Sequence, residues 1–390
     1  MIGNSNKTNI NINYVLMWVV LSCLGIALIT GLTIYFYDVS PQPVAIKDNV
    51  EDQRRLQAIY LLPKEKHADE KYRLNDFLSA ASRLGIRAYA VDNIRSDEDC
   101  MMLIEKYIDR GVKVVVSPAR RFVNCIDQTS KKIKGKNSIK FISVYDDVLR
   151  DNSNTITFKV QLYQIYYLSG IIAASISNSE HFIFTVPELN GDSYRNINAF
   201  TLGVRKYKKN GMVHVVVLSS TNEHVQYAKL TQTIIRYPDI SVMAAEYTDV
   251  TVDEFCEQKV PYCIRYDRDF ASKYFLSTVG NIQVDYRGFF SRSLSRIISG
   301  SFEAGNYLLN ISNGSTRIGS LNADVISPNV LKNVDLIFNR FMISDDNIFS
   351  GPVYDNEHHL RLDKGSTLRD RSDQMFSMDW LVEGTVVEKL

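Results

Sequence analysis

Apolar runs alternate with amphipathic segments along most of the chain from residue 55 onwards. The apolar runs predict strands at 57–62, 86–91, 112–117, 139–144, 182–186, 212–218, 240–245 and 262–266. The segments between them predict helices at 69–84, 97–110, 119–133, 161–178, 192–209, 223–236 and 251–258. Strands that alternate with helices of this length are typical of parallel sheets with right-handed crossovers. Two such series predict an α/β fold of two doubly wound parallel-sheet lobes, with a ligand between them at the carboxyl ends of the strands.

One strand, turn and helix in the second series, His181–Gly203, shows the pattern most clearly. Buried positions of its helix recur at the spacing of one helix face, and they are Ile197, Phe200, Thr201 and Val204. Its turn contains one glycine, Gly191, and no GxGxxG pattern, so it is not a dinucleotide-binding loop. We therefore expect this segment to form part of a cleft wall in the second lobe.

The N-terminal segment differs from the rest of the chain. Val15–Tyr37 is an uncharged apolar run that would reach about 35 Å as a helix, enough to cross a bilayer. A cleaved signal peptide has a shorter apolar core and a small-residue cleavage site, so we favour an uncleaved anchor over a cleaved signal. Cys23 ends a sequence that loosely resembles a lipoprotein cleavage box. The membrane-compatible run continues beyond Cys23, however, which a lipidated N-terminus would not need.

These patterns divide the chain into six parts. The predicted parts are a polar segment 1–13, an anchor or signal 14–37, a linker 38–54, a first lobe 55–158 with 279–310, a second lobe 159–278 with 311–345, and a tail 346–390. In the tail, Ser350–Leu362 predicts a hairpin around a polar turn.

Charge and cysteine content narrow the function. The 45 basic and 44 acidic residues nearly cancel, which argues against a dedicated nucleic-acid binder. Apart from Cys23, the four cysteines would form two disulfides in an oxidising compartment, or remain as four buried thiols. No zinc-type spacing, Gly-rich phosphate loop or nucleophile motif occurs. We therefore expect no metal, no cofactor and no enzymatic activity.

Four segments carry a family likeness. They are Asn198–Gly203, Gly300–Tyr307, Phe349–Asp355 and Ser377–Gly384, and together they resemble the basic membrane protein family of substrate-binding proteins. The last segment is similar to the purine- or nucleoside-binding branch of that family. The resemblance runs from about Phe158 to the C-terminus and implies a class I periplasmic binding protein with a three-strand hinge. It also implies a partner, the permease of an ABC importer.

The ligand loops of this family are only partly matched in this sequence. Relatives carry a Gly-Asp-x-Gly loop after the first strand, where residues 62–69 here read LPKEKHAD. After the third strand, residues 117–122 read SPARRF, which keeps a hydroxyl and an aromatic ring but adds two arginines. The resemblance also implies that Asp267, in the second lobe, and Tyr286, at the start of a helix, are retained. The first-lobe wall is therefore remodelled and the second-lobe wall half kept.

Three residues are candidates for contact with a base or sugar. Asp267 follows an apolar strand, where its carboxylate would accept hydroxyls of a ribose or an N–H of a base; the alternative is a helix N-cap. Phe200 would stack on a base, or else belong to the apolar core face of its helix. Tyr286, at the start of a helix expected over 285–299, would either stack on a ligand or pack in the core.

Three further candidates lie at strand ends. Ser117 and Arg121 occupy a turn where a guanidinium favours a phosphate or carboxylate, although a solvated arginine pair is the commoner outcome. Asp249 would contact a ligand or, more in keeping with its position, cap the helix at 251–258.

The sequence thus predicts a membrane-tethered solute-binding protein whose globular part is periplasmic or extracytoplasmic, at the inner cell membrane. Its ligand would be a small purine- or nucleoside-like molecule, held between the lobes. The alternative is a sensor or interaction module that uses the same fold with an altered ligand or none.

Overall fold

The computed structural model describes residues 55–63, 68–133, 138–144, 153–247, 250–266, 276–344 and 347–389. The chain divides into an N-terminal unit, Met1–Arg54, and a compact unit, Arg55–Leu390. The expected membrane segment Val15–Tyr37 lies outside the described residues. Among the residues that are described, no helix combines the length and apolar character needed to cross a bilayer.

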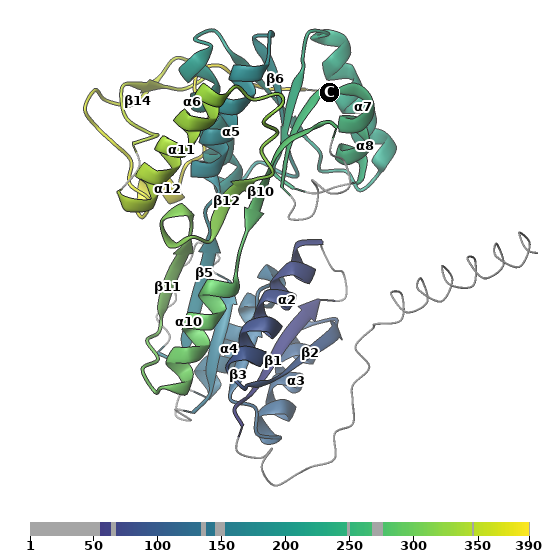
Figure 1. Ribbon diagram of the computed structural model, residues 1–390. Coiled ribbons are helices and arrows are strands. Elements are labelled where there is room, and N and C mark those ends of the chain that lie inside the picture. Colours follow the sequence, from purple (N-terminus) through teal and green to yellow (C-terminus); the bar gives the residue numbers. More distant parts are fainter. Residues whose placement is uncertain are drawn as a thin grey trace, which may run out of the picture. The chain divides into compact units, whose positions relative to one another are not determined.

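The first sheet has six parallel strands in the order β11-β5-β4-β3-β1-β2 (Figure 1). The strands are β1 (Gln57–Pro63), β2 (Arg87–Ile94), β3 (Val114–Ser117), β4 (Lys140–Val144), β5 (Thr155–Val160) and β11 (Gly305–Leu309). Helices α2 (Ala68–Arg83) and α10 (Arg287–Ile298) cover one face, and α3 (Asp97–Asp109) and α4 (Val123–Lys132) cover the other. Each face encloses its own hydrophobic cluster, because successive strand residues point to opposite sides.

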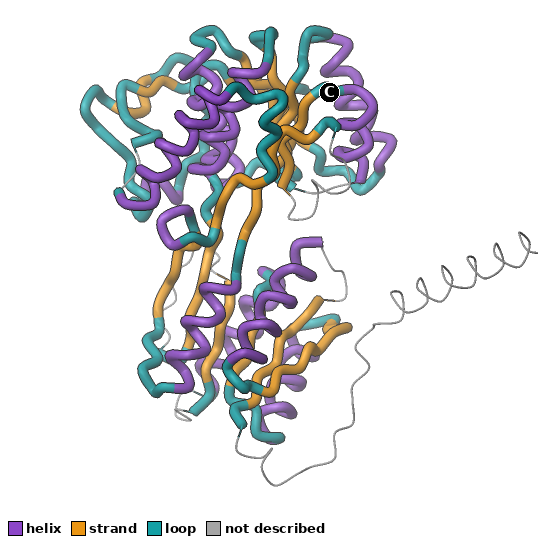
Figure 2. Tube along the Cα trace, in the orientation of Figure 1, coloured by secondary structure: helices purple, strands orange, loops and turns teal. Residues whose placement is uncertain are grey.

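The second sheet has the order β12-β10-β9-β8-β6-β7-β15, and only the edge strand β12 runs antiparallel. Its strands are β6 (His181–Val186), β7 (Met212–Val217), β8 (Val242–Ala245), β9 (Tyr262–Tyr266), β10 (Thr278–Val284), β12 (Thr316–Gly319) and β15 (Thr385–Val387). Helices α5 (Tyr163–Ile176), α6 (Gly191–Tyr207) and α11 (Pro328–Ile343) pack on one face, and α7 (Glu223–Arg236) and α8 (Val250–Lys259) on the other. Figure 2 shows helices on both sides of the strands in each sheet.

Both sheets share one winding pattern. In each, the first strand of the series lies between the second and the third, and the fourth and fifth follow outward. The predicted doubly wound parallel sheets are therefore observed, and each contains a switch point where the winding direction reverses: β1/β3 in one sheet and β6/β8 in the other. In the described residues the chain passes between the sheets after β5, after β10 and after β11.

Two predicted boundaries need correction. We expected 279–310 to belong to the first lobe, but β10 pairs in parallel with β9 and so belongs to the second sheet. The chain crosses only after β10, at α10. We also expected 346–390 to form a separate tail, but β15 pairs with β7 and extends the second sheet.

The remaining elements are short. They are η2 (Arg120–Phe122), η3 (Ile311–Asn313), β13 (Val353–Tyr354), β14 (Leu360–Leu362) and α12 (Asp373–Phe376). The predicted tail hairpin is present as the antiparallel pair β13–β14. The helix expected over 119–133 begins instead as the 3-10 turn η2 and becomes regular at α4.

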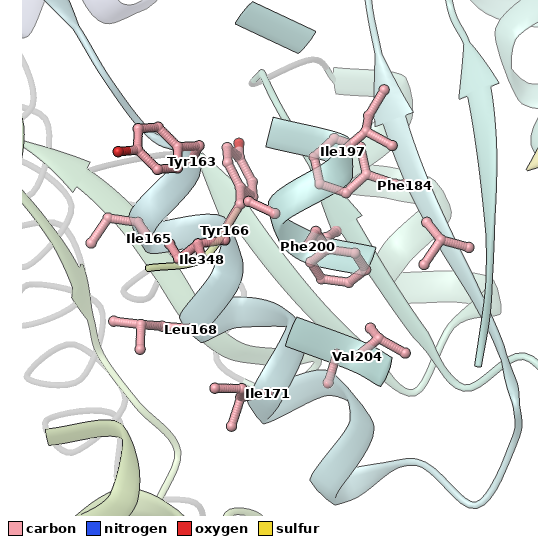
Figure 3. Packing of buried hydrophobic residues seen from close by; sticks show 14 of the residues in the cluster. Tyr163, Ile165, Tyr166, Leu168, Ile171, Phe184, Ile197, Phe200, Val204 and Ile348 are labelled. Atoms are coloured by element: carbon pink, nitrogen blue, oxygen red, sulfur yellow. The ribbon is translucent and has the colours of Figure 1, made fainter. Parts of the chain in front are cut away.

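The contact between α5 and α6 depends on two glycines. A Cβ atom at Gly170 would overlap the carbonyl oxygen of Phe200, and one at Gly203 would overlap the carbonyl oxygen of Tyr167. The helix backbones therefore lie in direct contact, and Phe184 of β6 packs against one ring from each helix, Tyr166 of α5 and Phe200 of α6 (Figure 3). The ring centroid of Phe184 lies 5.1 Å from that of Tyr166 and 5.2 Å from that of Phe200.

The four cysteines of the described chain form two disulfides, Cys100–Cys125 and Cys256–Cys263. The first joins α3 to α4 on one face of the first sheet, and the second joins α8 to β9. Of the two alternatives left open by the sequence, disulfides and buried thiols, the structure has the disulfides. Cross-links of this kind are typical of proteins outside the reducing cytosol.

We expect Gly203→Ala to lower the free energy of unfolding by about 1–3 kcal/mol, because the new methyl group must push two helix backbones apart. Chemical denaturation of the full chain measures the change. Gly288→Ala is the matched control: its Cβ would meet only the flexible end of Arg292, at 3.3 Å, so the higher helix propensity of alanine leaves stability equal or slightly higher. Equal effects of the two substitutions would contradict the role given to the helix crossing.

Candidate functional site

A cavity of about 470 Å³ lies at the carboxyl ends of strands from both sheets. Its lining comes from β1, α2, the turn after β3, β4, β5, the start of α6, the end of β9 and the residue before α10. The lining residues are Pro63, Glu70, Arg73, Pro118, Ala119, Arg120, Arg121, Val144, Phe158, Lys159, Val160, Asp192, Tyr266 and Tyr286. The ends of β1 and β3 are the switch point of the first sheet, the usual ligand position in such folds.

The turn after β3 supplies two arginines to the cavity. The Nη2 atom of Arg121 donates to the carbonyl oxygen of Arg95 at 2.8 Å, and its guanidinium lies 5.1 Å from the centre of the Phe122 ring. From α2, the Nη1 atom of Arg73 donates to the carbonyl oxygen of Pro118 at 2.9 Å. These contacts hold the turn and orient its basic side chains.

Asp192, at the start of α6, is the centre of an ion cluster. Its carboxylate lies 3.0 Å from Nη2 of Arg120 and 3.2 Å from Nζ of Lys159, and it also pairs with Arg195. Burial would raise the pKa of Asp192, but Arg195, Lys159 and Arg120 outweigh it and hold the pKa below its ordinary value. Asp192 therefore stays ionised and joins residues of both sheets.

The position of Asp192 follows from the local sequence. The side-chain oxygen of Asn190 accepts hydrogen bonds from the backbone N–H groups of Asp192 and Ser193, at 3.0 and 3.1 Å, and so caps α6. An acidic residue in the first helical turn is also favoured by the helix dipole. The strand, turn and helix that stood out in the sequence thus deliver one carboxylate to the cavity.

Three aromatic residues complete the lining. Tyr286 is 2% exposed, its ring centroid lies 6.1 Å from that of Phe158, and the guanidinium of Arg73 lies 5.8 Å from the ring centre. Tyr266 is partly exposed at the end of β9 and packs against hydrophobic clusters of both sheets. Phe158 is only 1% exposed, so Tyr266 is the one of these three rings that presents an accessible surface to a flat, apolar ligand.

A carboxyl group with a perturbed pKa lies at the switch point of the second sheet. Glu246 follows β8 directly, and it accepts hydrogen bonds from Oγ of Ser193 at 2.7 Å and Nδ2 of Asn196 at 2.6 Å. Burial of its carboxyl raises the pKa to about 7, and the nearby charge of Asp192 acts in the same direction. Glu246 therefore titrates near neutrality beside the ion cluster of α6.

The structure brings two of the six predicted site residues to the cavity. Arg121 and Tyr286 line it. Ser117 is fully buried on the face of β3 that also carries Val115, and it is not among the lining residues. Phe200 is fully buried in the core between α6 and β6. Two further candidates, Asp267 and Asp249, lie outside the described residues.

Several lining residues were not singled out from the sequence, namely Arg73, Phe158, Lys159, Asp192 and Tyr266. Tyr266 could have been found, since it is the last residue of a predicted strand. Lys159 and Phe158 lie on β5, a strand that the sequence patterns did not predict. Within the described part of the chain, no group of three or more His, Cys, Asp or Glu side chains is placed to hold a metal ion.

Two doubly wound sheets with a cavity at their carboxyl ends define a two-lobed α/β binding protein. The particular family follows from the sequence. Residues 45–329 match the family model Bmp, described as ABC transporter substrate-binding protein PnrA-like, so the chain belongs to this family. It is therefore a substrate-binding protein of a kind that serves ABC transporters. The match confirms the resemblance noted above, although two of its four segments, Phe349–Asp355 and Ser377–Gly384, lie beyond the matched residues.

Several solved structures share this fold. A Bacillus halodurans protein described as a transcriptional activator of the comK gene has a TM-score of 0.64 and 16% identity, over 74% of this chain and 98% of its own. An ABC transporter solute-binding protein from Conexibacter woesei gives 0.60 and 14%, over 76% and 100%. One from Aeropyrum pernix gives 0.58 and 11%, over 74% and 91%. At these identities the likeness shows the fold alone. A comparison with curated proteins finds no significant match.

The raised pKa of Glu246 predicts a pH-dependent effect on stability. Between about pH 4.5 and pH 7 the folded chain binds more protons at this site than the unfolded chain, so its contribution to stability falls as pH rises through that window. We expect Glu246→Gln, which cannot ionise, to be more stable than the wild type by about 1–2 kcal/mol at about pH 8, with no such gain at about pH 5.

Thermal or chemical unfolding at the two pH values measures this difference. Glu254→Gln, an exposed position on α8, is the control and should show no pH-dependent difference. A Glu246→Gln variant that is destabilised equally at both pH values would show that the hydrogen bonds of Glu246 outweigh its burial.

Proposed function

We propose that the protein is a membrane-tethered extracytoplasmic receptor that binds a purine or nucleoside derivative in this cavity and delivers it to an ABC permease. The observation that carries the proposal is the composition of the cavity, where aromatic rings and fixed polar groups converge at a switch point. Tyr266 offers a ring surface for a base and packs against the cluster of the buried rings Phe158 and Tyr286, and Asp192 together with the turn after β3 offers hydrogen-bonding groups. Family membership supports a small-molecule ligand and a permease partner.

Binding of a nucleoside should stabilise the folded chain. A ligand at about 100 times its Kd adds about 2.7 kcal/mol to the free energy of unfolding. We expect isothermal titration of the full chain to detect at least one purine base or nucleoside from a panel. Tyr266→Leu should weaken that binding about tenfold or more, because a base loses its stacking partner.

Tyr354→Leu is the control for this substitution, since Tyr354 lies in the β13–β14 hairpin and is not a lining residue. Its affinity should equal that of the wild type. A panel in which no base or nucleoside binds, or a Tyr266→Leu variant that binds as tightly as the control, would contradict the purine proposal.

The tether rests on the apolar run Val15–Tyr37, and the extracytoplasmic location is supported by the two disulfides. We expect the full chain to sediment with membranes and to resist alkaline extraction, whereas deletion of 14–37 releases it. If the protein expressed from the full-length sequence is recovered in the soluble fraction and is shortened at its N-terminus, the apolar run is instead a cleaved signal.

A second role is a sensor or interaction module held at the membrane. It is favoured by one observation, that the same fold occurs in the Bacillus halodurans protein described as a transcriptional activator. The two roles differ in their partners. Capture of an ABC permease by the ligand-loaded full chain supports the receptor, and retention of a different complex whether or not ligand is present supports the module.

A further inference from the structure

The charges that face the cavity are not balanced. Of the described lining residues, four are basic and two are acidic: Arg73, Arg120, Arg121 and Lys159 against Glu70 and Asp192. This local excess contrasts with the whole chain, whose net charge is +1 over 390 residues. Among the described lining residues, positive charge therefore predominates.

Asp192 is shared among several cations. It contacts Arg120 and Lys159, and also Arg195, which does not line the cavity. The side chains of Lys159 and Arg195 are only 4% and 3% exposed, so water does little to screen them. Among the contacts of the described residues, one carboxylate faces three cations, so Asp192 does not by itself neutralise Arg120, the most exposed of them.

Arg121 contributes to the excess of basic lining residues. Among the described residues no carboxylate pairs with it; its contacts are the neutral carbonyl of Arg95 and the face of the Phe122 ring. Both contacts fix the guanidinium plane, so the remaining N–H donors are oriented before any ligand arrives. An oriented guanidinium matches the two oxygens of a phosphate or a carboxylate better than it matches a neutral group.

The adjacent Arg120 places a second guanidinium on the same turn. Its side chain is 57% exposed, and its contact with Asp192 joins the first sheet's turn to α6. Water and salt reach Arg120, so its guanidinium can turn from Asp192 to a ligand anion at a smaller cost than the buried Lys159 or Arg195 could. Two neighbouring arginines at a strand end thus present guanidinium groups that can pair with an anionic group of a solute but not with a neutral one.

We propose that the solute bound in this cavity carries an anionic group, a phosphate or a carboxylate, which Arg120 and Arg121 bind at the turn after β3. This inference rests on the proposed function in that it takes the cavity to be the solute site. It does not require the solute to be a purine. In the nucleoside class, the ligand would be a nucleoside 5′-monophosphate or a related acid.

The test compares matched neutral and anionic ligands on three scaffolds, by isothermal titration of the full chain. The pairs are guanosine and its 5′-monophosphate, adenosine with its 5′-monophosphate and its 5′-carboxylate, and ribose with ribose 5-phosphate. The anionic member should bind at least about tenfold more tightly than its neutral partner, as a charge-assisted contact implies. That preference should shrink between about 50 and about 500 mM salt, because part of the contact is exposed.

Two variants locate the contact. Arg121→Gln should reduce the ratio of anionic to neutral affinity about tenfold, and Arg120→Gln should reduce it as well. Arg110→Gln is the control: this exposed arginine at the end of α3 is not a lining residue, so the ratio should stay as in the wild type. An anion preference that survives both cavity substitutions would overturn the assignment to this turn.

The outcomes also separate this inference from the purine proposal. Tighter binding of a nucleotide supports both. If ribose 5-phosphate binds more tightly than ribose and no nucleoside or nucleotide binds, the anionic-solute proposal is supported and the purine proposal is overturned. If neutral nucleosides bind as well as their monophosphates, the anionic-solute proposal is overturned and the purine proposal is supported. If no ligand of any pair binds, both proposals fail, and the arginines are a solvated surface pair.

Discussion

The direct backbone contact between α5 and α6 is the constraint on which the second lobe depends. Gly170 and Gly203 lack the side chains that would separate the helices, so both helices lie close against β6. The same crossing fixes the axis of α6, whose first turn carries Asp192. A packing requirement near the end of the helix thereby determines where a carboxylate lies at its beginning. Interiors packed at crystal-like density transmit such requirements along a rigid helix.

The C-terminal segment secures the passage between the two sheets. Asp370 accepts a hydrogen bond from the Tyr163 hydroxyl and one from Nδ2 of Asn310, the latter at 3.2 Å, while Nε2 of Gln161 donates to its backbone carbonyl. Gln161 and Tyr163 follow β5, and Asn310 follows β11, so one residue of the tail contacts two of the crossings. Burial raises the pKa of the Asp370 carboxyl, so the hydrogen bonds at this junction depend on the protonation state of Asp370.

The sequence predicted the architecture well because alternating strands and helices leave few topologies open. It predicted the site less well, since lining a cavity depends on which side of a strand a residue faces. Ser117 shares a strand face with Val115, opposite to Val114 and Val116, so it lies on the side of the sheet that α3 and α4 cover and is not a lining residue. The helical spacing of Phe200 already indicated the core, and the structure shows it there. No short-range sequence pattern predicts that Lys159 lines the cavity, because its position depends on the pairing of β5 with β4 and β11.

The turn after β3 explains how the remodelled wall could still select a ligand. A neutral solute that enters the cavity displaces water from Arg121 and supplies no charge in return, so it loses the solvation of that group. An anionic solute replaces the lost water with a charge-assisted hydrogen bond. Discrimination between anionic and neutral solutes then has two sources, the attraction of the anion to Arg121 and the penalty for leaving the guanidinium without a hydrogen-bond partner. Sites built around fixed polar groups reject analogues that lack the matching group in the same way. On this proposal, the two arginines of the turn after β3 would change the class of solute, while the fold and the aromatic lining residues stay as they are.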